Sequence, residues 1–427
     1  MDTIFALATV PGKSGVAVVR VSGPKANDSC DVFGFSVPSP RHSVVRRLEH
    51  ASRGFLDEAL ILAFAEGASF TGEPVVEFHL HGSIAIINTV IDCLGELPGF
   101  RAAEAGEFTR RALNNGRLDL TQVEALADLI DAETEMQRKQ ALMGFTGRLR
   151  DQSDTWRADL VHALSLLEAT IDFADEDVPV DVSADVERLL NGVIETMTRE
   201  IDGYGIAERV RNGFEVAIVG PPNAGKSTLL NALAGRDAAI TSEIAGTTRD
   251  VIEVRMDLGS LPVTFLDTAG LRDTEDTIES IGIQRAVDRA RAADLRVFLR
   301  GDGNFGELHP LEHDIVVDGK SDLRKDGQGI SGLTGEGVQE LIDQVKTYLF
   351  SKATMAGLVS HERQKHVLLE GRDALRKAID LVHLGPEQYD IASEELRSAI
   401  FTLERLVGRV DVEDVLDMVF SSFCIGK

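Results

Sequence analysis

The chain has 427 residues, more than one compact core usually holds, so two or three domains are expected. Its formal charge of −26 argues against a nonspecific nucleic-acid binder, because phosphate repulsion would act over the whole surface. No run of eighteen apolar residues spans a membrane, and the first ten residues lack the basic start of a signal peptide, so a cytoplasmic protein without a membrane partner is expected. The three cysteines lie far apart and indicate neither a disulfide framework nor a zinc site.

The negative charge is unevenly distributed. Residues 1–120 carry 11 Lys and Arg against 14 Asp and Glu, so most of the excess lies in the rest of the chain. Arginines of this region could therefore still bind an RNA substrate locally. Surface arginines with no binding partner are nevertheless the commoner explanation for such residues. The candidates are Arg41, Arg46, Arg47, Arg110, Arg111 and Arg117.

Residues 3–100 alternate short β-like runs with turns before a helical stretch. This mixture predicts an α+β domain at the front of the chain. The predicted strands are Ile4–Thr9, Val16–Val21, Leu60–Phe64 and Val75–Leu80, and the predicted helix is Ile84–Leu97.

From Leu118 the spacing of apolar residues becomes helical and predicts long amphipathic helices. The pattern is interrupted at about Gly213–Phe350 and resumes in His361–Val382 and Ile391–Phe420. The interruption has the strand and loop pattern of a nucleotide-binding domain. The sequence therefore predicts such a domain inserted into a helical one.

The inserted segment begins with an apolar run, Val216–Val219, that ends in a glycine-bounded loop. Residues 220–227 match G-x-x-x-x-G-K-[ST], the pattern of a phosphate-binding loop. Glycines let the backbone wrap an anion, Lys226 reaches the outer phosphates, and Ser227 offers a hydroxyl to Mg²⁺. The loop alone can arise by chance in a strand-turn-helix, but further matches follow in the order of a GTPase.

Those matches supply the remaining parts of a GTP site. Gly246-Thr247-Thr248 is a candidate switch segment, and Asp267-Thr268-Ala269-Gly270 follows a predicted strand, with the aspartate expected at Mg²⁺ and Gly270 at the γ-phosphate. Ser331-Gly332-Leu333 resembles the S-A-x loop that supports a guanine base.

Leu271 stands where Ras-like enzymes have a glutamine that orients the attacking water. Either another group orients this water, or the protein hydrolyses GTP poorly and acts only as a switch.

Gly319 departs from the N-K-x-D pattern of guanine-specific proteins, although Lys320 and Asp322 are present. The aspartate reads guanine, so guanine should still be preferred over adenine. Loss of the asparagine removes one or two hydrogen bonds, on the order of 1 to 3 kcal/mol. The sequence predicts weak but guanine-selective binding that Gly319→Asn would strengthen.

The whole chain resembles the MnmE (TrmE) family of tRNA modification GTPases. The stretches that carry the resemblance are TIFALATVPGKSGVAVVRVSG, SFTGEPVVEFHLHGS, AGEFTRRALNNGRLDLTQVEALADLI, GPPNAGKS, GTTRD, DTAGLR and the C-I-G-K end. The resemblance implies a multidomain α/β protein. Its parts would be an N-terminal α+β tetrahydrofolate-binding and dimerisation domain at 1–117, an α-helical domain at 118–212 and 353–427, and an inserted Ras-like P-loop GTPase domain at 213–352.

The resemblance also implies an activity. Such proteins are K⁺-dependent GTPases that form homodimers and, in a heterotetramer with the FAD-containing partner MnmG (GidA), act on certain tRNAs. They add a carboxymethylaminomethyl or aminomethyl group to C5 of the wobble uridine (U34). The one-carbon unit comes from a tetrahydrofolate derivative, 5-formyl- or 5,10-methylene-tetrahydrofolate, while GTP is a substrate and Mg²⁺ and K⁺ are cofactors.

Site residues follow from the matched positions. Folate contacts would be Arg20, Glu77, Arg117 and Lys427; K⁺ ligands would be Asn223, Ser242, Ile244 and Thr247; Mg²⁺ ligands would be Ser227 and Thr248. The resemblance gives Glu279 the positioning of the hydrolytic water, and Cys424 is a candidate participant in tRNA modification. The expected GTP site comprises Asn223, Ala224, Gly225, Lys226, Ser227, Thr228, Ser242, Ile244, Thr247, Thr248, Asp267, Thr268, Ala269, Gly270, Lys320, Asp322, Ser331, Gly332 and Leu333.

Two other functions remain open at this stage. One is a GTP-operated RNA-binding switch in ribosome assembly, although no appended RNA-binding domain follows the GTPase. The other is a folate-dependent aminomethyltransferase without GTP control, which the intact phosphate loop disfavours.

Overall fold

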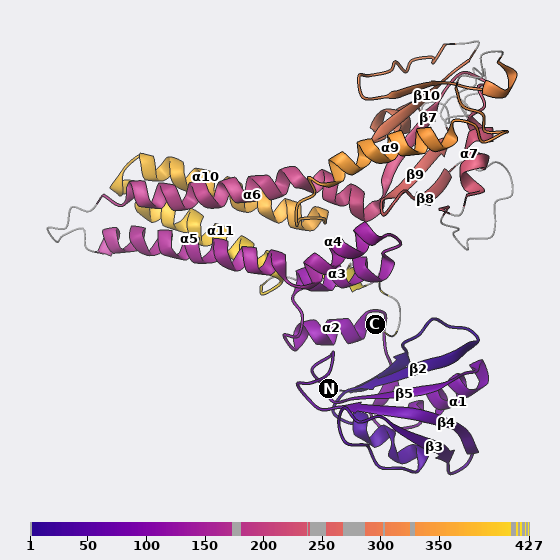
Figure 1. Cartoon of the computed structure of the whole chain (residues 1–427). Helices are drawn as coiled ribbons and strands as arrows, with labels where there is room; N and C mark the ends of the chain where they lie inside the picture. Colours follow the sequence, from indigo (N-terminus) through magenta and orange to yellow (C-terminus); the bar gives the residue numbers. More distant parts are fainter. Residues whose placement is uncertain are drawn as a thin grey trace, which may run out of the picture. The chain divides into compact units, whose positions relative to one another are not determined.

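The computed structural model describes residues 2–172, 181–236, 238–239, 253–267, 287–301, 304–324, 329–410, 416, 419–420, 423 and 426. The chain divides into two compact units, which are described separately (Figure 1). The N-terminal unit is Met1–Ala127 with Glu404–Lys427, and the central unit is Asp128–Leu403. None of the described helices combines the length and apolar content needed to cross a membrane.

The N-terminal unit is built on one six-stranded sheet in the order β3-β4-β5-β2-β1-β6. All neighbouring pairs are antiparallel except β1 and β6, which are parallel. Helix α1 (Ile84–Gly95) contributes Val90 and Leu94 to the core on one face, together with Phe33 and Phe78. The strands are β1 (Thr3–Leu7), β2 (Ser14–Ser22), β3 (Val44–His50), β4 (Gly54–Phe64), β5 (Val75–Gly82) and β6 (Phe100–Ala102), and the 3₁₀ turns are η1 (Ala26–Ser29) and η2 (Asp31–Phe33).

Strands β3 and β6 were not expected from the sequence. Strand β3 lies at the sheet edge and carries two adjacent exposed arginines, so it lacks the alternation that marks a half-buried strand. Strand β6 has only three residues. Strand β6 also depends on pairing with β1, which lies far away in the chain and leaves no local pattern, whereas β3 pairs with the next strand, β4.

Helices α2 (Glu107–Asn114) and α3 (Leu120–Asp131) follow the sheet. Phe108 of α2 packs with Ile4 and Ala6 of β1, so α2 covers part of the second sheet face. The C-terminal residues belong to the same unit, because Phe420 and Phe423 pack with Val123 of α3.

Long helices occupy much of the central unit, where α6 packs against both α5 and α10 (Figure 1). Trp156 of α5 is buried and donates from its indole N–H to Thr196 Oγ1 of α6 at 2.8 Å. The helices are α4 (Glu135–Phe145), α5 (Arg148–Asp172), α6 (Ser183–Asn212), α10 (Glu362–His383) and α11 (Tyr389–Val407), with η4 (Pro386–Gln388) before α11. The expected helical segment Ile391–Phe420 is divided: α11 ends at Val407, because Gly408 adopts a left-handed φ of 80°, and residues 416, 419 and 420 are helical again.

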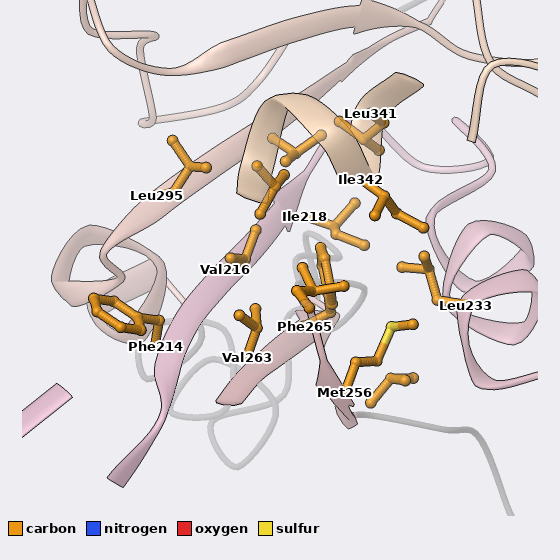
Figure 2. Packing of buried hydrophobic residues seen from close by; sticks show 14 of the residues in the cluster. Phe214, Val216, Ile218, Leu233, Met256, Val263, Phe265, Leu295, Leu341 and Ile342 are labelled. Atoms are coloured by element: carbon orange, nitrogen blue, oxygen red, sulfur yellow. The ribbon is translucent and has the colours of Figure 1, made fainter. Parts of the chain in front are cut away.

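The nucleotide-binding part of the central unit is a five-stranded sheet in the order β11-β10-β7-β9-β8. Strands β7, β9, β10 and β11 are parallel, and β8 is an antiparallel edge strand. Figure 2 shows Val216, Ile218, Val263 and Phe265 of the inner strands packed with Leu341 of α9. The elements are β7 (Phe214–Val219), α7 (Lys226–Ala234), β8 (Glu253–Asp257), β9 (Pro262–Asp267), β10 (Leu295–Arg300), β11 (Ile315–Asp318), η3 (Ser321–Leu323) and α9 (Val338–Ala353).

Candidate functional site

The phosphate loop lies between the carboxyl end of β7 and the start of α7, at the edge of a parallel sheet where ligands generally bind. Asn223 and Gly225 adopt left-handed φ values of 62° and 99°, a backbone shape that turns successive N–H groups toward one concave side. Asparagine tolerates this conformation better than most residues with a side chain. The loop therefore has the backbone form of an anion cradle.

Lys226 is held inside this loop. Its side-chain ammonium donates to the carbonyls of Gly220 and Pro221 at 2.8 and 3.0 Å, and the residue is only 7% exposed. Burial of a lysine is costly without such partners. These contacts keep the positive charge of Lys226 next to the concave backbone, where it would stabilise a bound phosphate most strongly.

Ser227 and Asp267 meet at the same edge of the sheet. Ser227 Oγ, at the start of α7, donates to Asp267 Oδ2, at the end of β9, at 2.8 Å. A hydroxyl and a carboxylate are oxygen donors of the kind that Mg²⁺ prefers. These two residues fit a Mg²⁺ ion beside a bound phosphate.

A separate cavity of about 220 Å³ lies beside the phosphate loop, where a nucleotide base would be read. Ser331 Oγ donates to Asp322 Oδ1 at 2.6 Å and fixes the orientation of that carboxylate. Ser331 is itself fixed, because its Oγ accepts from the backbone N–H of Leu333 and of Thr334, each at 3.2 Å. The lining residues are Ala224, Gly225, Thr228, Leu229, Leu299, Gly319, Lys320, Asp322, Leu323, Ile330, Ser331, Gly332 and Leu333.

A second group of expected site residues lies on the sheet of the N-terminal unit. Arg20 on β2 and Glu77 on β5 are register partners, and Arg20 Nε lies 2.9 Å from Glu77 Oε1. The Arg20 guanidinium also lies over the Phe108 ring of α2, 5.8 Å from its centroid. The sequence offered no sign of this aromatic support.

His79 adds a feature that the sequence reading did not assign to this group. Its Nε2 lies 3.4 Å from Glu77 Oε2, and this buried nitrogen has no hydrogen-bond partner among the described residues. Buried polar atoms are normally paired, so this one marks a polar position left open beside the carboxylate. Such a position fits a bound heterocycle rich in nitrogen and oxygen, as tetrahydrofolate is.

Arg117 and the chain end are less closely tied to this group. The exposed Arg117 lies beside Gly72, where an added Cβ would stand 3.3 Å from the arginine Cγ, and among the described residues it forms no hydrogen bond or ion pair with Arg20 or Glu77. Gly426 lies against the end of β1, so close that an added Cβ would be 2.1 Å from Leu7 O. Gly426 thus lies against the same sheet.

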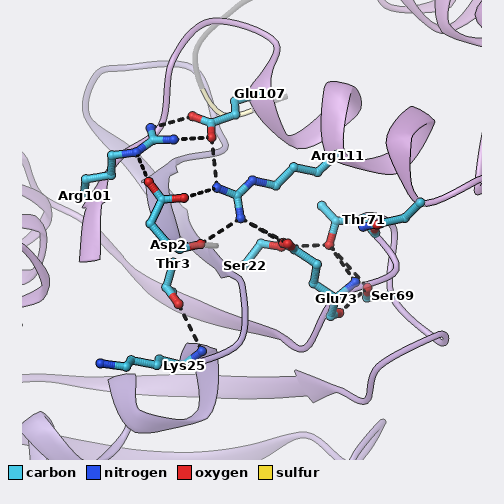
Figure 3. A network of polar contacts seen from close by, with 11 residues as sticks. Asp2, Thr3, Ser22, Lys25, Ser69, Thr71, Glu73, Arg101, Glu107 and Arg111 are labelled. Atoms are coloured by element: carbon cyan, nitrogen blue, oxygen red, sulfur yellow. Dashed lines mark hydrogen bonds and ion pairs between the residues drawn. The ribbon is translucent and has the colours of Figure 1, made fainter. Parts of the chain in front are cut away.

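Arg111 is not available for RNA, contrary to one expectation from the sequence. It is half-buried and binds Asp2, Glu73 and Glu107, with its guanidinium 2.9 to 3.1 Å from their carboxylate oxygens (Figure 3). Asp2 and Glu73 lie 109 and 38 residues away in the sequence, so no local motif reveals them, whereas Glu107 lies four residues before Arg111 on the same helix. Arg111 thus links α2 to residues that lie next to strands β1 and β5 of the sheet.

The same network shifts the ionisation of its carboxylates. The hydrogen bond from Arg101 lowers the pKa of Asp2 below its ordinary value. Burial raises the pKa of Glu107, but hydrogen bonds from Arg101, the Glu104 backbone and Arg111 outweigh it, so the pKa of Glu107 also lies below its ordinary value.

Several expected site residues lie outside the described part of the chain. They are Ser242, Ile244, Thr247, Thr248, Thr268, Ala269, Gly270, Glu279, Cys424 and Lys427, together with Leu271.

Comparison with known proteins gives matches along the whole chain. The family description "MnmE helical domain" matches residues 120–424, and "GTP-binding protein TrmE N-terminus" matches residues 3–117. The chain is 58% identical over 429 residues to a protein of Cereibacter sphaeroides and 56% identical over 428 residues to one of Roseobacter denitrificans, each named tRNA modification GTPase MnmE. Both matches cover 100% of either chain.

Solved structures give only a distant match. The cytosolic domain of the T. maritima FeoB iron transporter in a GDP form is 16% identical, with a TM-score of 0.23 over 45% of this chain and 98% of that one. A likeness at this level supports no inference.

Proposed function

The chain belongs to the MnmE family of tRNA modification GTPases, and from that premise we propose that it hydrolyses GTP as part of the modification of tRNA. The observation that carries the proposal is the phosphate loop, with Lys226 held over it and Ser227 paired with Asp267. These groups supply positive charge and oxygen ligands where a Mg²⁺-bound triphosphate accumulates charge during hydrolysis.

The proposal extends to a potassium-dependent mechanism. A monovalent cation between the phosphates would supply the charge that an arginine finger supplies elsewhere, and it needs only oxygen ligands. Asn223 would be one ligand, and its left-handed conformation at the lip of the loop is compatible with this role. Ser242, Ile244 and Thr247 would complete the set, Thr248 would join the Mg²⁺ ligands, and Glu279 would position the attacking water in place of the glutamine that Leu271 replaces.

The proposed second substrate site is the group around Glu77 in the N-terminal unit. A carboxylate suits the paired donors on the edge of a pterin ring, and Arg20 holds this carboxylate in place. The open Nε2 of His79 supports a nitrogen-rich ligand here. Arg117 and Lys427 would add positive charge for the anionic tail of a tetrahydrofolate derivative, either 5-formyl- or 5,10-methylene-tetrahydrofolate.

The remaining parts of the proposal rest on family membership alone. The protein would be a cytoplasmic homodimer that joins MnmG in a heterotetramer and modifies C5 of the wobble uridine, with Cys424 taking part in that step. The proposed domain limits are 1–117 for folate binding and dimerisation, 118–212 and 353–427 for the helical domain, and 213–352 for the GTPase.

The cation dependence gives the sharpest test of the hydrolysis mechanism. We expect GTP hydrolysis to be stimulated by K⁺ and not by Na⁺. Asn223→Gly keeps the left-handed backbone available but removes the amide oxygen, so it should abolish most of the stimulation while leaving GDP binding near the wild-type level. Equal hydrolysis rates in the two salts would contradict the proposed cation site.

A further inference from the structure

Two loops around the base cavity have glycine where guanine-binding patterns have a side chain. Gly319 takes the position of the asparagine in N-K-x-D, and Gly332 that of the alanine in S-A-x. Both line the cavity beside the phosphate loop. They come from different loops, one after β11 and one before α9.

Both glycines are required by space. A Cβ at Gly319 would lie 2.6 Å from the carbonyl oxygen of Ala224 in the phosphate loop. A Cβ at Gly332 would lie 2.6 Å from Leu229 N in the first turns of α7. Neither glycine has a φ in the left-handed region, so an alanine would be excluded by these contacts and not by backbone strain.

The atoms in the way are backbone atoms, which cannot swing aside as the end of a flexible side chain can. The two loops therefore lie directly on the phosphate loop and α7, with no side chain between them. A substitution would have to push a whole loop outward. In a close-packed interior such a shift is costly and extends to neighbouring groups.

The neighbouring group that matters is Asp322, the carboxylate expected to read guanine. It lies three residues after Gly319, and it is oriented by Ser331, which immediately precedes Gly332. Displacing either loop would move the carboxylate or the hydroxyl that orients it. The position of Asp322 relative to the phosphate loop thus depends on both glycines.

We propose that Gly319 and Gly332 are specificity-determining positions of the base site, because their bare backbones let the two loops close onto the phosphate loop and set Asp322 at the distance that guanine needs. The inference rests on the proposed GTP binding. It reverses the expectation drawn from the sequence: an asparagine at position 319 weakens guanine nucleotide binding, since its Cβ has no room.

The test is a titration of the full-length wild type, Gly319→Ala, Gly319→Asn and Gly332→Ala with fluorescent GDP, with ADP as competitor. Each variant should bind GDP about tenfold or more weakly, the loss expected when a buried polar contact is displaced. The preference for GDP over ADP should also fall, because Asp322 is misplaced. A general loss of folding would lower both affinities together and leave that ratio unchanged.

Two further variants keep the test decisive. Gly235→Ala lies in the same domain, and its Cβ would have an ordinary 3.5 Å contact with Asn231 O, so it should bind like the wild type. Ser331→Ala removes the hydrogen bond to Asp322 without adding atoms, so it should reduce the GDP preference even if the glycine variants do not fold.

Thermal unfolding of every variant identifies those that fold. Tighter GDP binding by Gly319→Asn, wild-type behaviour of the folded glycine variants, or an unchanged preference in Ser331→Ala would overturn the inference. Failure of the wild type to bind GDP would instead contradict the proposed function.

Discussion

The two candidate sites differ in how the chain assembles them. Around the phosphate loop, the contributing groups lie on loops at the carboxyl ends of parallel strands, and most of the cradle is one continuous stretch, residues 220–227. In the N-terminal unit, Arg20 and Glu77 come from two strands of an antiparallel ladder and are 57 residues apart in the sequence.

This difference explains why one site leaves a local sequence motif, while the other could be predicted only from the resemblance of the whole chain to a family. A phosphate loop binds largely through its backbone, so its residues must be adjacent and leave a motif. A pair of side chains on neighbouring strands depends on register, and shifting the pairing by one residue would turn Glu77 to the other face of the sheet. The first site is local and the second is a product of the fold.

The largest effect is expected from removing the charge at the phosphate loop. Lys226→Ala should lower GTP hydrolysis by about a hundredfold or more, because it deletes a preorganised cation where negative charge develops. Folate binding should not change. Lys346→Ala, which removes an exposed lysine of α9, is the matched control, and an active Lys226→Ala enzyme would show that the loop does not act on phosphate.

The two sheets should also be separable by core substitutions. Phe265→Ala in the nucleotide-binding sheet and Phe78→Ala in the N-terminal sheet each remove a fully buried ring, at a cost of about 3 to 5 kcal/mol. Hydrogen exchange followed by mass spectrometry should show faster exchange mainly in the sheet that carries the substitution. Equal loss of protection in both sheets would mean that they unfold as one cooperative unit.

A smaller and more selective effect is expected at Glu77. Glu77→Gln removes the charge that pairs with Arg20, and binding of 5-formyltetrahydrofolate should weaken about ten- to a hundredfold. GTP hydrolysis should be retained. Glu58→Gln, an exposed glutamate on neighbouring β4, controls for charge; unchanged folate binding by calorimetry in Glu77→Gln would remove Glu77 from the site.

The smallest effect concerns pH and distinguishes the network around Arg101 from the surroundings of Asp294. Asp2 and Glu107 have a pKa below the ordinary values of 3.8 and 4.5, so the stability they contribute is present above those values and is lost as the pH falls through the lowered ones. Burial raises the pKa of Asp294 in the central unit above 3.8, so its contribution is present at low pH and is lost as the pH rises through the raised value.

Acidification below about pH 4.5 should therefore loosen the network of Asp2, Arg101 and Glu107 before the region around Asp294. Hydrogen exchange followed between pH 5 and pH 3 measures the loss of protection in the two regions. The double variant Asp2→Asn, Glu107→Gln is the control, and in it the difference in protection between the surroundings of Arg101 and those of Asp294 should shrink. A steeper loss of protection around Asp294 than around Arg101 would show the opposite order.

The sequence predicted more of the fold than of the contacts that tune the sites. The inserted nucleotide-binding domain, the long helices and the phosphate loop were predicted because strand runs, helical periodicity and glycine spacing are local signals. Edge strand β3 was missed because it has no buried alternation. The end of α11 was missed because the apolar pattern continues past Gly408, and only the left-handed backbone there reveals the stop.

Contacts between distant residues could not be predicted. Arg111 looked like a surface arginine, since two of its three carboxylate partners, Asp2 and Glu73, are contributed by distant parts of the chain. Gly319 looked like a lost asparagine, and only the backbone of the phosphate loop beside it shows that a side chain has no room. In both cases the missing information was the distance between two segments, which no spacing along the chain encodes.

The nucleotide site and the N-terminal site are proposed to serve one reaction on tRNA. The decisive measurement is an analysis of wobble uridines in a bacterium that lacks its own MnmE and carries either the wild-type chain, Lys226→Ala or Glu77→Gln. Modified uridine should be restored by the wild type and by neither variant, although each purified variant retains the activity of its unaltered site. Full modification with either variant, or none with the wild type, would contradict the account.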